Sequence, residues 1–107
     1  MSALHTVNKS PFSSTALASC LAHAADDAAI ILIEDGVYAA LASAHPVAGL
    51  PTDGLAAVAA RGALHALGPD LEARGLDGSK LIDGVKLVDY AGFVDLTVAH
   101  QPVMAWL

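Results

Sequence analysis

The single cysteine of the chain is its strongest candidate for covalent chemistry. His23 follows Cys20 by three residues, and side chains three apart share one side of a helix, so the imidazole is a candidate base or cationic neighbour. A thiolate accepts and passes on sulfur by exchange at sulfur, which makes Cys20 a candidate persulfide carrier. The alternative is a structural cysteine. Residue 20 falls on the apolar side of its expected helix and too far from the helix start to feel the dipole, and the residues alone favour this second interpretation.

Two carboxylates, Glu34 and Asp35, form a second candidate group. They end the apolar run Ala29-Ile30-Ile31-Leu32-Ile33, which is typical of a strand buried on both faces of a parallel sheet. Gly36 then permits a sharp turn into the next helix. Ligands of open parallel sheets bind beyond the carboxyl ends of the strands, so the pair is predicted to stand at the functional edge. The alternative is that both residues only end the strand and cap the following helix.

Several stronger signatures are absent from the sequence. It contains neither glycine-rich phosphate loop, GxGxxG or GxxxxGK[ST], and no GxSxG nucleophile elbow. The histidines are too far apart for metal-ligand spacing, and there is one cysteine to share, so we predict no metal and no cofactor. Each histidine is interpreted as a packing, hydrogen-bonding or solvated residue; they are His5, His23, His45, His65 and His100.

Strand-like and helix-like segments alternate along the chain. The expected strands are residues 4–7, 29–33, 63–67 and 84–88, and the expected helical segments are 11–25, 37–44, 55–60, 69–74 and 90–100. An irregular loop is expected over 45–53, and residues 104–107 are expected to form an apolar tail after Pro102. This order predicts an α/β fold: one domain, residues 1–107, with a flavodoxin-like parallel sheet and helices on both faces.

The composition predicts a protein that works with partners. Hydrophobic residues make up 55% of the chain and charged residues 15%, against about 25% charged in a typical soluble domain. A surface so poor in charge is usually covered in part by other subunits, so we expect an oligomer. The net charge of −6, with scattered lysines and arginines, argues against direct nucleic-acid binding.

The sequence also predicts a cytoplasmic location. No apolar stretch reaches the roughly 18–20 residues of a membrane span, so no membrane partner is expected. The N-terminus lacks the basic start and apolar core of a signal peptide. A single cysteine cannot form an internal disulfide, which fits a reducing compartment.

Residues 4–12, LHTVNKSPF, closely resemble the opening of the DsrH/TusB proteins. Four further blocks resemble the family in matching order: LIEDGV at 32–37, DLEARGL at 70–76, VDY with FV at 88–90 and 93–94, and LTVAH with MAW at 96–100 and 104–106. None of these blocks is a catalytic signature. Their number and order make the resemblance specific over nearly the whole chain.

The resemblance implies a DsrEFH-like fold and a subunit of a cytoplasmic sulfur-relay complex. Its partners would be DsrE/TusD-like and DsrF/TusC-like subunits in a hetero-hexamer that passes persulfide sulfur to downstream carriers. The TusB branch serves 2-thiolation of the wobble uridine of tRNA, and the DsrH branch serves oxidation of stored sulfur. The principal sulfur-carrying cysteine belongs to the DsrE/TusD partner. DsrH-like members carry a first-helix cysteine that Cys20 matches, which favours that branch.

Three hypotheses therefore stand side by side. The chain is a docking subunit of a sulfurtransferase complex, or Cys20 itself carries persulfide, or the chain is a stand-alone module that binds a small molecule near Asp35. The missing phosphate motifs make the third the weakest.

Overall fold

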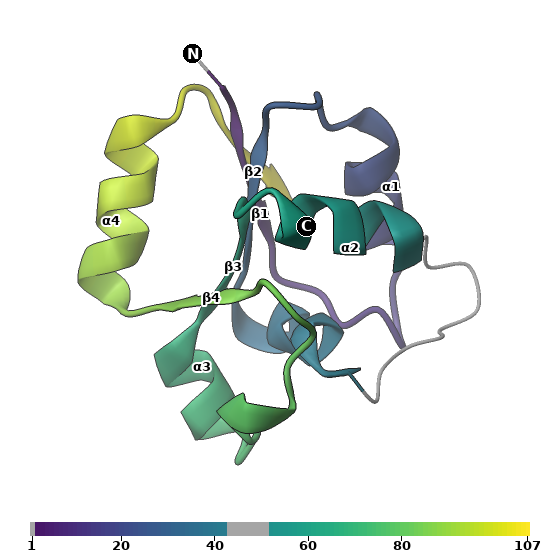
Figure 1. Cartoon of the computed structure of the whole chain (residues 1–107), viewed down its shortest axis with the longest axis vertical. Helices are drawn as coiled ribbons and strands as arrows, with labels where there is room; N and C mark the ends of the chain where they lie inside the picture. Colours follow the sequence, from purple (N-terminus) through teal and green to yellow (C-terminus); the bar gives the residue numbers. More distant parts are fainter. Residues whose placement is uncertain (1, 43–51) are drawn as a thin grey trace.

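Five parallel strands form the sheet within residues 2–42 and 52–107, which are the residues that this computed structural model describes. The strands are β1 (Leu4–Val7), β2 (Ala29–Leu32), β3 (Leu64–Leu67), β4 (Lys86–Val88) and β5 (Val103–Trp106). Their order across the sheet is β4-β3-β2-β1-β5 (Figure 1). The α/β class and the parallel sheet are confirmed.

The helical segments are α1 (Ala16–His23), the 3-10 helix η1 (Glu34–Ala40), α2 (Thr52–Ala60), α3 (Gly68–Ala73), the short 3-10 turn η3 (Gly78–Lys80) and α4 (Tyr90–Ala99). Figure 1 shows α1 and α2 on one side of the sheet and α4 on the other. Helices therefore cover both faces, as predicted.

The central strand β2 joins two apolar clusters. Ile30 and Leu32 point into the larger cluster, with α1, α2 and η1, whereas Ala29 and Ile31 point into a smaller one against α4. Both neighbours of β2 are parallel strands, with Ile30 paired to His5 on one side and to Leu64 on the other. Each fully buried isoleucine contributes about 2 kcal/mol of hydrophobic stabilisation, which makes β2 the core of the fold.

The apolar tail predicted for residues 104–107 is wrong. Residues Val103–Trp106 form an edge strand parallel to β1, with Leu4 paired to Val103 and Val7 to Trp106. The indole Nε1–H of Trp106 donates to Nδ1 of His5 across 3.0 Å and ties the strand to its neighbour. These partners lie 101 positions apart in sequence, so no local pattern reports them.

Two helical predictions need correction as well. The first helix begins at Ala16 rather than at Pro11, because the amides of Ser13 and Ser14 donate to the Ser10 carbonyl in a turn. Serine side chains here bond nearby backbone and compete with the helix. In place of the helix predicted over 37–44, the chain forms the 3-10 helix Glu34–Ala40, which ends before an extended Leu41. Residues 43 and 44 of that prediction and residues 45–51 of the predicted loop 45–53 lie outside the described residues. Residues 52 and 53, predicted to belong to the loop, begin α2.

In the described part of the chain, every helix is too short or too polar to cross a membrane.

Candidate functional site

Glu34 and Asp35 stand at the carboxyl edge of the sheet, where the sequence placed them. They form the first turn of η1, directly after β2 and Ile33. Asn8 follows β1 and Asp70 lies in α3 after β3, so three neighbouring strand ends bring their polar residues to one edge. Asp70 and Asn8 are the members of this group that the sequence reasoning missed.

Glu34 is held by hydrogen bonds from both neighbouring strand ends. Its backbone N–H donates to Oδ2 of Asp70 across 2.6 Å, and Nδ2 of Asn8 donates to its Oε2 across 3.4 Å. Its φ of 50° lies in the left-handed region, which is uncommon for a residue with a Cβ. The carboxylate of Asp70 therefore caps the start of η1 from another helix and offsets this strained backbone.

Asp35 forms an ion pair with α3. Nε of Arg74 donates to Oδ1 of Asp35 across 2.9 Å, and this bond is the main cause of the raised pKa of Arg74. Because Asp35 is 62% exposed, the pair contributes at most about 1 kcal/mol. Glu34 and Asp35 thus have protein partners that fasten η1 to its surroundings, although neither side chain caps the helix as the structural alternative supposed.

Gly36 lets η1 pack directly on β1. A Cβ at this position would overlap the carbonyl oxygen of Val7, so only glycine fits. The turn predicted at Gly36 is wrong in position: the chain turns at Glu34, whose φ is positive, and Gly36 is already the third residue of η1. Glycine is required there by its close approach to the backbone of β1 and not by a positive φ.

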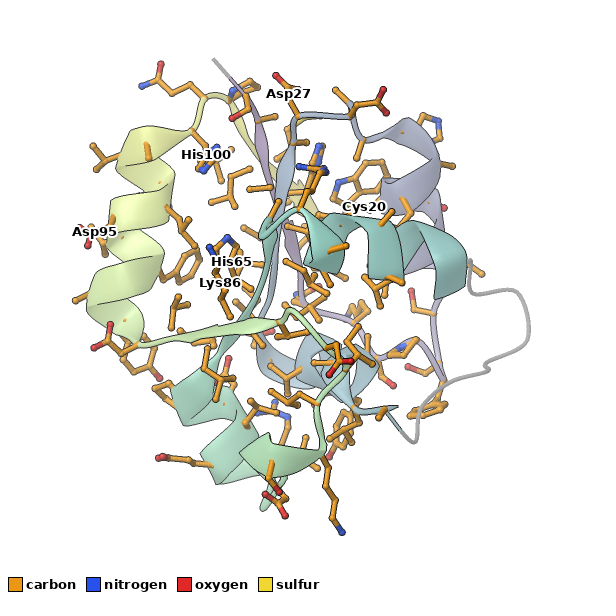
Figure 2. All side chains as sticks on the ribbon, viewed as in Figure 1. Cys20, Asp27, His65, Lys86, Asp95 and His100 are labelled. Atoms are coloured by element: carbon orange, nitrogen blue, oxygen red, sulfur yellow. The ribbon has the colours of Figure 1, made fainter. Side chains whose placement is uncertain are left out.

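Cys20 lies in the apolar core. It is fully buried on the inner side of α1, in the cluster that includes Leu55 and Val58 of α2, and Figure 2 shows it between these two helices. Burial disfavours the charged thiolate and raises the pKa of Cys20 to about 12. At neutral pH the residue is a protonated thiol that packs like a small apolar side chain.

His23 turns away from the core. Its Nδ1 lies 2.7 Å from the carbonyl oxygen of Ser19 and donates to it, so this nitrogen is committed to the backbone of α1. The imidazole also lies near the Trp106 ring, with centroids 5.9 Å apart. The three-residue spacing from Cys20 therefore places His23 on the same helix without directing it at the buried thiol.

The other histidines make separate contacts. His5 accepts from Trp106, and Nδ1 of His100 lies 2.8 Å from Oγ of Ser2. His65 is buried beside Lys86 under α4, and its pKa is lowered by burial and then by the charges of Lys86 and His100 (Figure 2). His45 lies outside the described residues. Within the described residues no three His, Cys, Asp or Glu side chains cluster in a way that would hold a metal ion.

An open pocket lies beyond the carboxyl ends of β3 and β4. Its volume is about 520 Å³, and it is lined by residues of α3, β4 and the start of α4: Gly68, Glu72, Leu87, Val88, Asp89 and Gly92. This is the edge where parallel sheets bind ligands. No local sequence pattern predicts this pocket, because its walls come from two segments about twenty residues apart that only the fold brings together.

The fold defines the class of protein. An all-parallel α/β sheet with helices on both faces is also found in the crystal structure of the ychN protein from E. coli, which matches with a TM-score of 0.72. The match covers 98% of this chain and 99% of that chain at 20% identity, so it shows the fold alone.

The sequence comparisons define the family. A family model described as DsrH like protein matches residues 9–103. Protein TusB of Pectobacterium parmentieri is 37% identical over 103 residues, which is 96% of this chain and 99% of the relative. Protein TusB of Photorhabdus laumondii is 37% identical over 105 residues with the same coverage. The chain belongs to the DsrH/TusB family, and this membership supports a role as a subunit of a sulfur-relay complex.

Proposed function

We propose that this chain is a docking subunit of a cytoplasmic sulfur-relay complex whose sulfur-carrying cysteine belongs to a partner. Family membership supports the relay role. The observation that supports a partner as the sulfur carrier is the state of Cys20, the one thiol of the chain, which is fully buried and whose pKa is raised to about 12 by burial. A group that receives sulfur must be reachable and must ionise, and Cys20 in this fold does neither.

The partners in this proposal are DsrE/TusD-like and DsrF/TusC-like subunits, assembled with this chain as a hetero-hexamer. Exposed apolar side chains on α4 and β5 support such an assembly, among them Val94, Val98, Val103 and Met104. Surfaces of this kind usually mark contacts with other proteins.

We place the complex in 2-thiolation of the wobble uridine of tRNA. The curated relatives named TusB, at 37% identity, support this branch. Oxidation of stored sulfur is the second candidate, and the first-helix cysteine that resembles DsrH members favours it. The tRNA itself would be served by downstream carriers, because a chain with a net charge of −6 lacks a basic surface for it.

Co-expression with the two homologous subunits from the same genome tests the docking role. A complex containing all three chains is expected by affinity purification of any one of them, with its mass set by light scattering. A stable monomer of this chain beside its would-be partners contradicts the proposal. Loss of 2-thiouridine from tRNA in a deletion strain, measured by mass spectrometry, supports the thiolation branch; unchanged 2-thiouridine supports sulfur oxidation.

The alternative, that Cys20 carries persulfide, has its own test. In that reaction the Cys20 thiolate attacks the outer sulfur of a donor persulfide, the donor S–S bond breaks, and the donor leaves as a thiolate. Mass spectrometry after incubation with a persulfide donor is expected to show no added sulfur on the free chain, and iodoacetamide is expected to label Cys20 only in denaturant. If the assembled complex gains one sulfur atom on this chain and Cys20→Ser abolishes the gain, Cys20 is the persulfide carrier and the docking-only role is wrong.

A further inference from the structure

Strand β5 forms one edge of the sheet and carries no charge along its length. Within the described residues its one strand neighbour is β1, so its other side is open. The segment 101–107, QPVMAWL, contains no charged side chain. Val103 is 46% exposed and Met104 is 44% exposed, and these neighbours point to opposite faces of the strand. An edge strand that is apolar and uncharged is a template for pairing with another strand.

The opposite edge of the sheet, β4, is protected in the ways that natural edge strands usually are. It is three residues long and begins with Lys86, which is exposed. Asp83 precedes it and Asp89 follows it directly. Short length and nearby charges both oppose the addition of a further strand. The two edges therefore differ, and β5 is the edge on which these features do not oppose pairing.

The register with β1 determines which backbone groups of β5 point outward. The N–H of Leu4 donates to the carbonyl of Pro102 across 3.0 Å, and Leu4 pairs with Val103. Because successive residues of a strand direct their backbone groups to opposite sides, Met104 and Trp106 bond to β1. The N–H and C=O of Val103 and Ala105 therefore point away from the sheet. Among the described residues, no other backbone group bonds to Val103 or Ala105.

The open side of β5 is complementary to a second copy of itself. In an antiparallel pair with a twofold axis at Ala105, the outward N–H and C=O of Ala105 bond to those of Ala105 in the second copy. Met104 then lies opposite Trp106 of the second copy, and Val103 lies opposite Leu107. A thioether beside an aromatic ring is a favourable contact, and every opposed pair is apolar.

Charge favours this contact between copies over others. Each copy has a net charge of −6, so most contacts between two copies would bring like charges together, whereas the β5 edge carries none. The proposed hetero-hexamer of three kinds of subunit also contains each subunit twice. Two copies of one subunit in a closed assembly are most often related by a twofold axis, and an antiparallel strand pair provides one.

We propose that the β5 edge pairs two copies of this chain, antiparallel and around a twofold axis, into one continuous sheet. This inference rests on the proposed function and deepens it, because it names the contact through which the two halves of the relay complex join. The occupant of the edge is strand Val103–Trp106 of the second copy.

Charged side chains at the axis test the pairing. Ala105→Lys and Ala105→Glu each set two like charges opposite one another, and each is expected to raise the dissociation constant between the two copies at least about tenfold. A mixture of the two variants opposes lysine with glutamate and is expected to restore the association. Leu87→Lys is the control, because Leu87 is 50% exposed on the opposite edge, and it should leave the association unchanged.

Native mass spectrometry of the complex with the two homologous subunits counts the copies of this chain, and the lone chain is measured beside it. Melting temperatures that match the parent chain show that each variant is folded.

Crosslinking gives a second measurement that needs no charged variant. Paired residues at the axis have Cα atoms about 5.5 Å apart, so Ala105→Cys is expected to yield a covalent dimer of this chain with a short bis-maleimide. Leu87→Cys on the opposite edge should give no such dimer. The parent chain should give none either, because Cys20 is fully buried.

The outcomes separate the two proposals. A chain that pairs with itself through Ala105 but binds neither homologous subunit overturns the proposed function and leaves this contact standing. A complex with two copies that resists both charged variants, or that Ala105→Cys does not crosslink, overturns the β5 contact alone. So does a complex that holds a single copy of this chain. If both charged variants weaken the complex and their mixture does not restore it, a strand of another chain occupies the edge and the second copy is wrong.

Discussion

Gly36 has no Cβ, and the carbonyl oxygen of Val7 fills the space that a Cβ at this position would need. Gly36→Ala is therefore expected to push η1 away from β1 and to lower the free energy of unfolding by about 3 kcal/mol. Urea unfolding followed by circular dichroism measures this loss. Gly75→Ala is the control: its φ is +65° but nothing lies within 4 Å, so it should cost only about 1 kcal/mol. Equal losses at both positions would contradict the close-approach explanation.

The contact between His5 and Trp106 makes the C-terminal strand sensitive to acid. Burial lowers the pKa of His5 below its ordinary value of 6.5, so the unfolded chain takes up the proton more readily than the folded one. The stability that neutral His5 provides is complete above about pH 6.5 and is lost as the pH falls further. Protonation of Nδ1 also removes the acceptor for the indole N–H. The pKa of buried His65 is lowered too, so this residue also makes the folded chain less stable as the pH falls.

Unfolding free energies measured between pH 7.5 and 5 are expected to fall, with the fluorescence of Trp106, the one tryptophan, reporting β5. In His5→Asn the amide oxygen replaces the acceptor and does not titrate, so the pH dependence should become shallower. An unchanged slope in His5→Asn would show that other groups control it.

At the scale of elements, the sequence pattern predicted the features that depend on neighbouring residues along the chain. The run through β2 is apolar because both of its faces are buried, and the carboxylates Glu34 and Asp35 mark its end, so both were readable in sequence. The position of the turn was not, since it falls at Glu34 and Gly36 lies inside η1. Strand β5 was not, since it depends on a backbone ladder with β1 and on the bond from Trp106 to His5. The capping of η1 by Asp70 and the pocket beside α4 were hidden for the same reason: their parts meet only in three dimensions.

Helix α4 depends on its cap more than most helices, because its inner side is only partly buried. Oδ1 of Asp89 accepts from the N–H of Gly92 across 2.7 Å, which satisfies an amide of the first turn. Asp89→Ala is expected to cost about 1 kcal/mol, measured by thermal unfolding. Asp95→Ala removes a carboxylate from the middle of the same helix and should change stability by less than about 0.5 kcal/mol. A loss in Asp95→Ala as large as that in Asp89→Ala would refute the capping role.

At the scale of the whole molecule, the two faces of the sheet differ in how completely helices cover them. One face carries α1, α2 and η1 over the larger cluster. Among the described residues, α4 is the helix that covers the other face, and apolar side chains on α4 and β5 remain exposed there, among them Val94, Val98 and Val103. The free chain is therefore expected to bind the dye ANS, whose fluorescence rises on apolar surface. Adding the homologous subunits should abolish that signal in step with assembly, because the same surface becomes buried. Val94→Asp should bind less dye from the start. Dye fluorescence that persists in the fully formed complex would mean that assembly uses a different surface.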